Sequence, residues 1–248
     1  HSFSDFSLPT GTEAFFNNAG NIQNILTRVT GNNPSNIDGL IRANGTANLF
    51  LINPNGLIFG NNARLAIGGS FFGSTANSLL FPDGEFPTNV GAGAIADGLP
   101  LLSVNVHIGL QMGENSAAIS VNGTGITDII PNDNLGLTVA PGQTFALIGN
   151  GINFNGGIVT APSGIIQIGS VANGTVGIIP TPIGFLLSYD LVNEFGNINL
   201  ANRSAIFSPA VVNNPLSQIT VTGKNIELNG SQIVSLTNGD ANSGNITI

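Results

Sequence analysis

Asn48-Leu-Phe-Leu-Ile-Asn-Pro-Asn-Gly-Leu-Ile-Phe-Gly60 consists of two short apolar runs on either side of a turn. Apolar residues occupy alternate positions in each run, as at Leu49 and Leu51, which is the period of a β-strand. In the turn, Pro54 fixes φ, and the Asn-Gly pair after it can take the left-handed backbone that a tight corner needs. The stretch therefore predicts two strands joined by a sharp corner.

A third apolar run follows this stretch and closes the same pattern. It contains Leu65 and Ile67 and ends at Gly68-Gly69. Leu49, Leu57 and Leu65 are each eight residues apart. Three short strands at equal spacing, with corners between them, indicate one coil of a solenoid rather than part of a flat sheet.

Composition favours a β-protein whose polar surface is made from amides and hydroxyls instead of charges. Hydrophobic residues make up 42% of the 248 residues, whereas charged residues make up only 7%, against roughly a quarter in typical globular domains. Asn is about as frequent as Gly, which numbers 34, and residues that favour long helices are scarce. The formal net charge of -8 argues against nucleic acid and anionic membrane as partners.

The chain contains no Cys, so it has neither disulfides nor thiolate chemistry. This fits a bacterial export route in which premature folding is a liability. No run of eighteen apolar residues is present, so we expect no membrane span. The opening, His1-Ser-Phe-Ser4, lacks the basic start and apolar core of a signal peptide, and we expect a chain that is either cytosolic or already processed.

Two regions depart from the regular strand pattern. Residues 1–35 are rich in Phe, including Phe6 and Phe16, which suits a segment that covers the open end of a core. Residues 82–135 are punctuated by prolines. We interpret them as an excursion from the solenoid, a hairpin or a loop, that rejoins it near Ile119-Ser-Val121.

Regular spacing returns after this excursion. Leu137 and Ile158 are 21 residues apart, and so are Ile198 and Ile219, a period within the range of solenoid repeats. The chain ends in mid-pattern at Asn245-Ile-Thr-Ile248, so we expect the natural chain to continue. The fold expected from these patterns is a right-handed parallel β-helix around a column of aliphatic side chains, with an extra-helical excursion and very little helix.

A polysaccharide lyase or hydrolase is the main enzymatic alternative, because parallel β-helices also host pectin-degrading enzymes. Such sites need paired carboxylates, or acids that bind calcium beside a basic residue. The closest groupings are Asp83 with Glu85 and Asp128 with Asp133, each in a Pro/Gly loop without a basic residue nearby in sequence. We interpret the acids as solvated loop carboxylates, while a calcium site in a loop stays open. The other acids are scattered and include Asp38, Asp97, Asp190 and Glu194.

The sequence contains no pattern typical of a metal site or of a nucleotide-binding site. The two histidines, His1 and His107, cannot build a three-His zinc site, and His107 suits a surface or edge position. The Gly-rich pieces lack the Lys-Ser/Thr of a phosphate-binding loop. We therefore expect no metal and no cofactor. Four Asn-Gly-Thr/Ser sequences match the glycosylation acceptor, although Asn-Gly corners beside Thr or Ser give the same pattern; they begin at Asn44, Asn122, Asn173 and Asn229.

Several segments occur together in an order that is known from one family. They are Arg28-Val-Thr-Gly31, Ile37-Asp-Gly39, the stretch 48–60, Gly68-Gly-Ser-Phe71 and Ser74-Thr-Ala76. This order resembles the two-partner secretion domain, also called the haemagglutination activity domain, of filamentous haemagglutinin-like exoproteins. The cyanobacterial members of the family are especially similar.

The resemblance implies a non-enzymatic, right-handed parallel β-helix that is exported by Sec. It implies recognition in the periplasm by the POTRA domains of a dedicated outer-membrane β-barrel transporter, followed by folding outside the cell. The product is then secreted or held at the cell surface, where it binds a ligand on a host or neighbouring cell. We expect a monomer in which residues 1–175 form the secretion domain and residues 176–248 begin the passenger β-helix repeats.

Two segments are candidates for transporter recognition or for a folding corner that export requires. They are Arg28, Val29, Thr30 and Gly31, and Asn53, Pro54, Asn55 and Gly56. Both interpretations stay open, because breaking a folding nucleus beside a recognition segment also impairs export. In the family an N-terminal strand normally caps the helix before the His-Ser-Phe element. This chain starts at His1, so we expect its first coil to be exposed.

Overall fold

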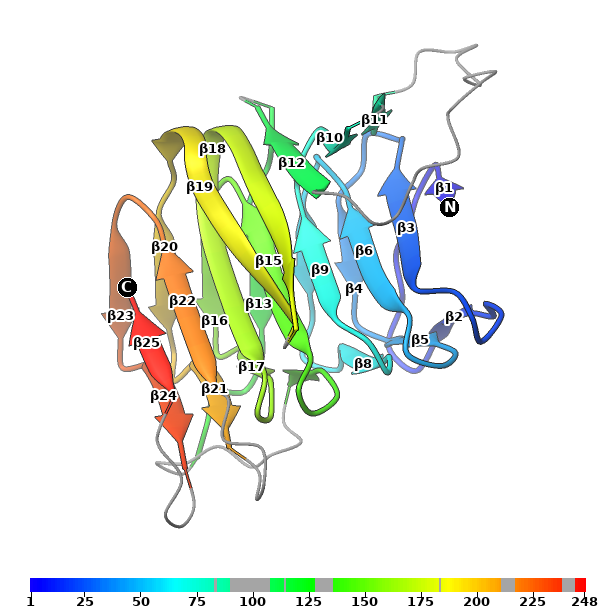
Figure 1. Cartoon of the computed structure of the whole chain (residues 1–248). Coiled ribbons are helices and arrows are strands. Elements are labelled where there is room, and N and C mark those ends of the chain that lie inside the picture. The colour runs from blue at the N-terminus through cyan, green and yellow to red at the C-terminus, as the bar shows by residue number, and fades with distance from the viewer. Residues whose placement is uncertain are drawn as a thin grey trace.

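The computed structural model describes residues 1–82, 84–89, 108–113, 115–127, 136–182, 184–210, 217–237 and 244–248. Every regular element in these residues is a β-strand. Most strands pair in parallel with the equivalent strands of the neighbouring coils. The coils follow one another along the molecule, with the two termini at opposite ends (Figure 1). The fold is therefore the predicted parallel β-helix.

Each coil contributes strands to three faces of the helix. The first face contains β1 (Ser2–Phe3), β3 (Asn24–Val29), β6 (Asn48–Ile52), β9 (Phe71–Ser74), β15 (Thr144–Gly149), β18 (Ile165–Thr181), β22 (Gln218–Thr222) and β25 (Asn245–Thr247). The second contains β4 (Ser35–Ile37), β7 (Leu57–Phe59), β13 (Ile119–Asn122), β16 (Ile152–Asn155), β20 (Ile198–Ala201) and β23 (Ile226–Asn229). The third is split into two sheets, with β2 (Glu13–Phe16), β5 (Leu40–Ala43) and β8 (Arg64–Ala66) in one, and β14 (Leu137–Thr138), β17 (Ile158–Thr160), β21 (Ala205–Pro209) and β24 (Gln232–Leu236) in the other.

The stretch 48–67 forms one coil, as its eight-residue spacing predicts. Its strands are β6, β7 and β8, one on each face. Leu49 and Leu57 are fully buried in the helix interior, and Leu65 packs against the same cluster. The apolar alternation of this stretch therefore marks the residues that fill the column.

The 21-residue period holds for only part of the helix. The separation between paired residues is 21 from β15 to β18 but 27 from β22 to β25. Leu137 pairs with Val159 instead of Ile158, and Ile198 lies in β20 whereas Ile219 lies in β22, on a different face. The two spacings noted in the sequence therefore do not join paired residues. The number of residues per coil varies because the corners between the paired strands differ in length.

A second, antiparallel sheet lies against the outside of the first face. It contains β10 (Ser78–Phe81), β11 (Gly84–Pro87), β12 (Ile108–Met112), the outer part of β18 and β19 (Gly184–Phe195). The predicted excursion ends as expected, because β13 rejoins the helix between β7 and β16. The hairpin of β18 and β19 is a further excursion that the sequence patterns did not predict.

The outer sheet makes the first face apolar on both sides. Leu49 and Leu51 point into the helix interior, while Phe50 and Ile52 belong to a second buried cluster beneath the outer sheet. The rings of Phe50 and Phe72 stack there with centroids 4.4 Å apart. This double burial explains why residues 49–52 are apolar without interruption, since strands buried on both faces lose their polar alternation.

The first coil is covered by its own aromatic side chains. Phe6 and Phe16 are buried, and the centroids of Phe3 and Phe6 lie 5.4 Å apart. The N–H of Leu8 donates to the carbonyl oxygen of Asn36 at 2.8 Å, which ties this segment to the next coil. The Phe-rich opening therefore covers the core as its composition predicted, while β1 and β2 each pair on one side only within the described residues.

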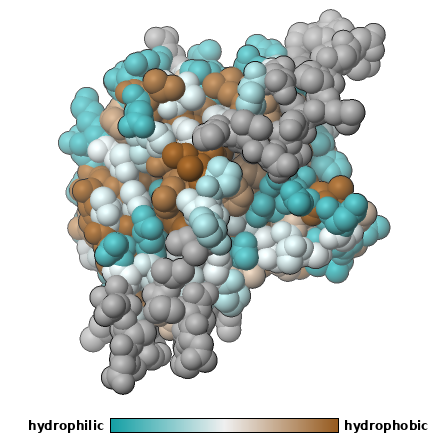
Figure 2. All heavy atoms as spheres, viewed as in Figure 1, coloured by the Kyte–Doolittle hydropathy of each residue, from teal (hydrophilic) through white to brown (hydrophobic). Residues whose placement is uncertain are grey.

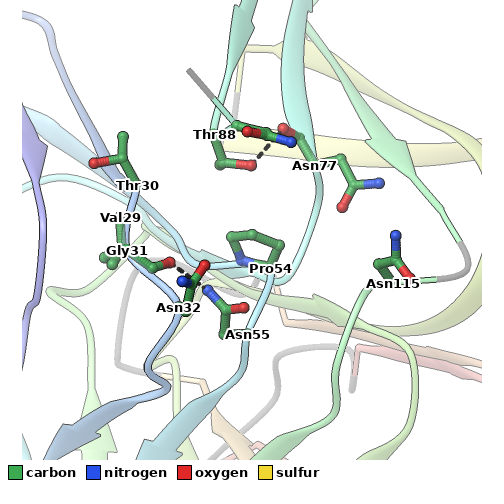
Figure 3. A pocket seen from close by; sticks show the side chains of 10 residues that line it. Val29, Thr30, Gly31, Asn32, Pro54, Asn55, Asn77, Thr88 and Asn115 are labelled. Carbon is green, nitrogen blue, oxygen red and sulfur yellow. Dashed lines mark hydrogen bonds between the residues drawn. The ribbon is translucent and has the colours of Figure 1, made fainter. Parts of the chain in front are cut away.

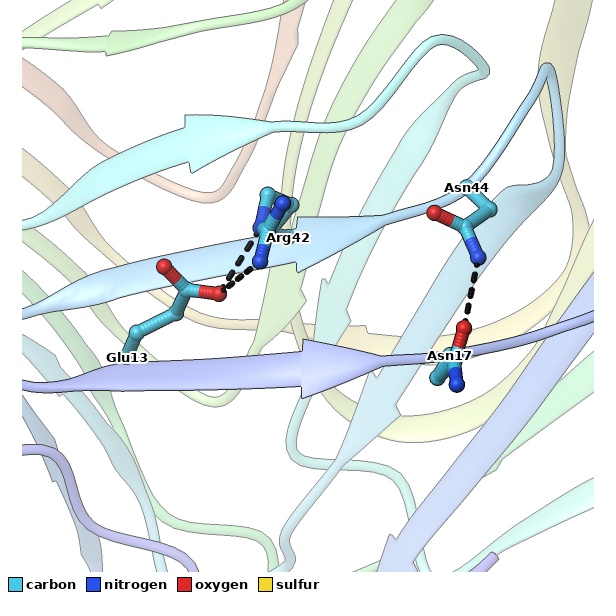
Figure 4. A network of polar contacts seen from close by, with 4 residues as sticks. All are labelled: Glu13, Asn17, Arg42 and Asn44. Carbon is cyan, nitrogen blue, oxygen red and sulfur yellow. Dashed lines mark hydrogen bonds and ion pairs between the residues drawn. The ribbon is translucent and has the colours of Figure 1, made fainter.

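Polar side chains also pair from coil to coil on the outer surface. Glu13 accepts from Arg42 at 2.7 Å, and Asn44 Nδ2 donates to Asn17 Oδ1 at 2.9 Å (Figure 4). Figure 2 shows hydrophobic residues scattered among hydrophilic ones on the face that it presents. Scattered apolar residues of this kind are normal for a folded surface.

Replacing Phe71 by Ala should lower the free energy of unfolding by about 3–5 kcal/mol. The Phe71 ring is fully buried, with the centroids of Phe59 and Phe145 at 6.1 and 5.7 Å. Urea denaturation followed by circular dichroism measures the loss. The control Leu191→Ala truncates a side chain that is 70% exposed and should change the value by no more than about 0.5 kcal/mol. Equal losses in the two variants would contradict the interior packing.

Candidate functional site

The corner Asn53–Gly56 joins β6 to β7. The N–H of Gly56 donates to the carbonyl oxygen of Asn53 at 3.1 Å, which closes the turn. Gly56 has a φ of 121°, a backbone conformation that residues with a Cβ adopt only under strain. The predicted sharp corner is therefore present, and its glycine is required by its geometry.

Asn53 is the hydrogen-bonding centre of this corner and is completely buried. Its Nδ2 donates to the carbonyl oxygen of Asn33 at 2.9 Å and to Ser35 Oγ at 3.0 Å, both in the preceding coil. Its Oδ1 accepts from the backbone N–H of Asn55 at 3.0 Å. Its own N–H donates to the carbonyl oxygen of Ser74, in the following coil, at 3.0 Å. One residue thus connects three successive coils.

Asn55 brings the two candidate segments together. Its Nδ2 donates to the carbonyl oxygen of Gly31 at 2.7 Å. Gly31 follows β3, and a Cβ at this position would overlap the carbonyl oxygen of Ser4. The neighbouring Thr30 donates its N–H to the carbonyl oxygen of Phe3 at 2.8 Å. The two segments therefore meet at a single corner of the helix, although 24 residues separate Gly31 from Asn55.

Arg28 belongs to the first candidate segment but contacts a different region. Its guanidinium lies 4.1 Å from the ring centroid of Phe86 and donates to the carbonyl oxygen of Pro87 and to Ser2 Oγ. Burial lowers the pKa of this guanidinium from its usual value. Arg28 thus fastens the β10–β11 hairpin to the first coils, whereas Val29 is buried in the helix interior and Thr30 and Gly31 lie at the corner.

A cleft of about 390 Å³ opens beside the corner. Pro54 lies between Asn32 and Asn55 on one side and Asn77 and Asn115 on the other (Figure 3). The lining residues come from the two candidate segments and from more distant parts of the chain; they are Val29, Thr30, Gly31, Asn32, Pro54, Asn55, Asn77, Thr88, Asn89 and Asn115. Sequence reasoning missed Asn32, which directly follows the first segment, and the last four, which no local pattern links. Only the long excursion places them here.

Asp38 lies at another corner, in a second cleft with Leu8, Pro9 and Gly60. Its carboxylate accepts from the hydroxyl of Thr10 and, at 2.7 and 3.0 Å, from the backbone and side chain of Asn62. The Thr10 hydroxyl and then the Asn62 contacts lower the pKa of Asp38. Asp38 was interpreted as a solvated loop carboxylate, but it joins three segments of neighbouring coils.

The other predicted chemical groups do not form a site within the described ranges. Asp83, Asp97, Asp128, Asp133 and His107 lie outside those ranges. Among the residues that the structure describes, no three His, Asp or Glu side chains gather closely enough to hold a metal ion. In the same part of the chain, no helix has the length and apolar character needed to cross a membrane.

The strands and the corner described above define a parallel β-helix with a hydrogen-bonded corner near its N-terminal end. Comparison with known families matches residues 1–220 to the TPS secretion domain. The chain therefore belongs to the two-partner secretion (TPS) domain family. It is a secretion-targeting domain of the two-partner type. The family is a transport-targeting one and not enzymatic.

A solved structure supports the fold independently. The crystal structure of the HMW1 secretion domain from Haemophilus influenzae is similar over 95% of this chain, with a TM-score of 0.51 and 17% sequence identity. The chain covers 64% of the length of that solved chain. Comparison with curated proteins gives no match.

Replacing Asn53 by Ala should lower the free energy of unfolding by about 2–3 kcal/mol. The change leaves the Ser35 hydroxyl and the backbone N–H of Asn55 without this partner in a buried corner. Chemical denaturation measures the loss. Asn61→Ala is the matched control, because Asn61 is exposed, and it should change the value by no more than about 0.5 kcal/mol. A loss at Asn53 no larger than the control's would contradict the role of this amide.

Asp38 should make the stability of the domain depend on pH in acid. Its pKa is lower in the folded chain than the value of about 3.9 expected when unfolded. The contribution of Asp38 to the free energy of unfolding is therefore complete above the pKa of the unfolded chain. It is lost as the pH falls through the pKa of the folded chain. The stability difference between the native chain and Asp38→Asn should stay constant between about pH 5 and 7 and shrink below about pH 4. A difference that grows in acid would contradict this assignment.

Proposed function

We propose that the POTRA domains of a dedicated outer-membrane β-barrel transporter recognise this domain in the periplasm, and that the domain then folds outside the cell. The observation that carries the proposal is the meeting of Arg28–Gly31 and Asn53–Gly56 at one corner, through the bond from Asn55 to Gly31. The corner therefore depends on both segments being present and intact.

The contacts of Asn53 support a role in folding. Asn53 is completely buried, so in the folded chain it is out of reach of a partner. It links the coil before it, through Asn33 and Ser35, to the coil after it, through Ser74. A corner that organises three coils near the N-terminal end suits emergence of the chain with its N-terminus first, because each later coil pairs with the edge already formed.

The remaining corner residues support a role in recognition. Pro54 and Asn55 are partly exposed and line the open cleft. Their side chains are therefore less essential to the packing of the folded coils than that of Asn53, which leaves them to serve the contact that the chain makes before it folds. We assign folding chiefly to Asn53 and transporter contact chiefly to Pro54 and Asn55.

The proposal also covers the role of the chain after export. We propose a monomeric, surface-exposed or secreted adhesin that binds a ligand on a host or neighbouring cell. Residues 1–175 act as the secretion domain, and residues 176–248 begin the passenger repeats. Continuity between the two parts is supported by β18, which spans the boundary, and by β20 to β25, which continue the coils of the helix.

Export through the cognate transporter tests this proposal. The wild-type chain, Asn53→Ala, Asn55→Ala and the control Asn61→Ala are produced in cells with that transporter. The amounts in the periplasm and outside the cell are then compared by immunoblot. Both corner variants should remain mainly in the periplasm, and the control should be exported like the wild type. Normal export of both corner variants would overturn the proposal.

Two further measurements separate recognition from folding. Binding of each urea-unfolded chain to the purified POTRA domains reports recognition alone. The refolding rate after dilution from urea reports the folding role. Asn53→Ala should refold slowly and still bind, whereas Asn55→Ala should bind more weakly. The reverse result would exchange the roles of the two residues.

A further inference from the structure

Asparagine side chains dominate the lining of the cleft beside the corner. Five of its ten lining residues are Asn, two are Thr, and none is charged. Asn32, Asn77, Asn89 and Asn115 make no side-chain hydrogen bond to any other residue in the described part of the chain. Their amides therefore remain available to a bound molecule.

Asparagines elsewhere on the helix are used differently. Asn48 Nδ2 donates to Asn24 Oδ1 at 2.8 Å, and Asn225 Nδ2 donates to Asn197 Oδ1 at 3.0 Å, each from one coil to the next. Such ladders satisfy the amides within the protein. The cleft amides lie instead on four separate segments. This arrangement suits a bound molecule that enters between the segments.

The chemistry of the lining selects an uncharged, polyhydroxylated ligand. Each free amide offers donors and an acceptor, which suits neighbouring hydroxyl groups that donate and accept in turn. Because no ionised side chain lines the cleft and the chain carries a net charge of -8, an anionic ligand gains no ion pair there. Pro54, which is partly exposed, adds apolar surface against which the C–H face of a sugar ring can pack. A volume of about 390 Å³ falls in the range of small-molecule sites.

We propose that this cleft is a binding site for a neutral saccharide. An extended peptide fits the lining less well. Recognition of a peptide as an added strand needs a row of unpaired backbone groups along a sheet edge, whereas this cleft presents side chains from Asn32, Asn77, Asn89 and Asn115. The cleft shares Pro54 and Asn55 with the proposed transporter contact, but the two events concern different states of the chain. The transporter meets the unfolded chain, whereas the cleft exists only when the coils and the outer sheet are assembled.

Saturation-transfer NMR and calorimetry on the folded chain test the proposal. The probes are D-glucose, D-galactose, N-acetyl-D-glucosamine and maltose, with D-glucuronate as the charged comparison and tetraglycine as the peptide comparison. At least one neutral saccharide should bind. Asn32→Ala and Asn115→Ala should each weaken its binding about three- to tenfold. An increase of NaCl from about 0.05 to 0.5 M should leave its Kd unchanged, because no ion pair is screened.

The control Asn61→Ala removes an exposed amide that does not line the cleft, and it should bind as the wild type does. Circular dichroism checks that each variant is folded, which is expected since Asn32 and Asn115 are exposed and make no side-chain bonds within the described residues. The proposal is overturned if none of the four neutral saccharides binds, if D-glucuronate or tetraglycine binds more tightly than they do, or if both cleft variants bind like the control.

Discussion

Parallel backbone pairing between successive coils is the interaction on which the whole structure depends. A strand as short as β7 cannot satisfy its own N–H and C=O groups, and it pairs with β4 on one side and β13 on the other. The corners must therefore return the chain to the same register in every coil. Asn53 does so with a buried amide that bonds to Asn33 and Ser35, and this is why one corner has consequences for several coils.

In-register pairing also explains the low charge of the chain. Equivalent residues of neighbouring coils lie roughly 5 Å apart, so identical charges in adjacent strands repel each other. Amides avoid this problem because one donates where the next accepts, as Asn199 does to Asn153 at 3.2 Å. Glu13 and Arg42, which do face each other across two coils, carry opposite charges. A chain with only 7% charged residues is consistent with this geometry.

The coil β6–β7–β8 was predictable because its strands and corners are local and its apolar residues alternate. Phe50 and Ile52 also carried a signal, since an unbroken apolar run indicates a strand buried on both faces. The hairpin of β18 and β19 was missed because its pairing depends on the outer sheet. Gly31 and Asn55 could be named from sequence because they lie in short local motifs. Asn77, Thr88 and Asn115 could not, because a long excursion sets the place where they meet.

The outer sheet imposes an order on the assembly of the domain. Leu110 of β12 pairs with Val176 of β18, and β19 ends only at Phe195. The first coils can wind as soon as they appear, yet the stacked rings of Phe50 and Phe72 stay uncovered until this distant ribbon arrives. Closing such a long loop is slow compared with local pairing. An apolar flank of the first coils therefore stays exposed to water during folding, until most of the domain has assembled.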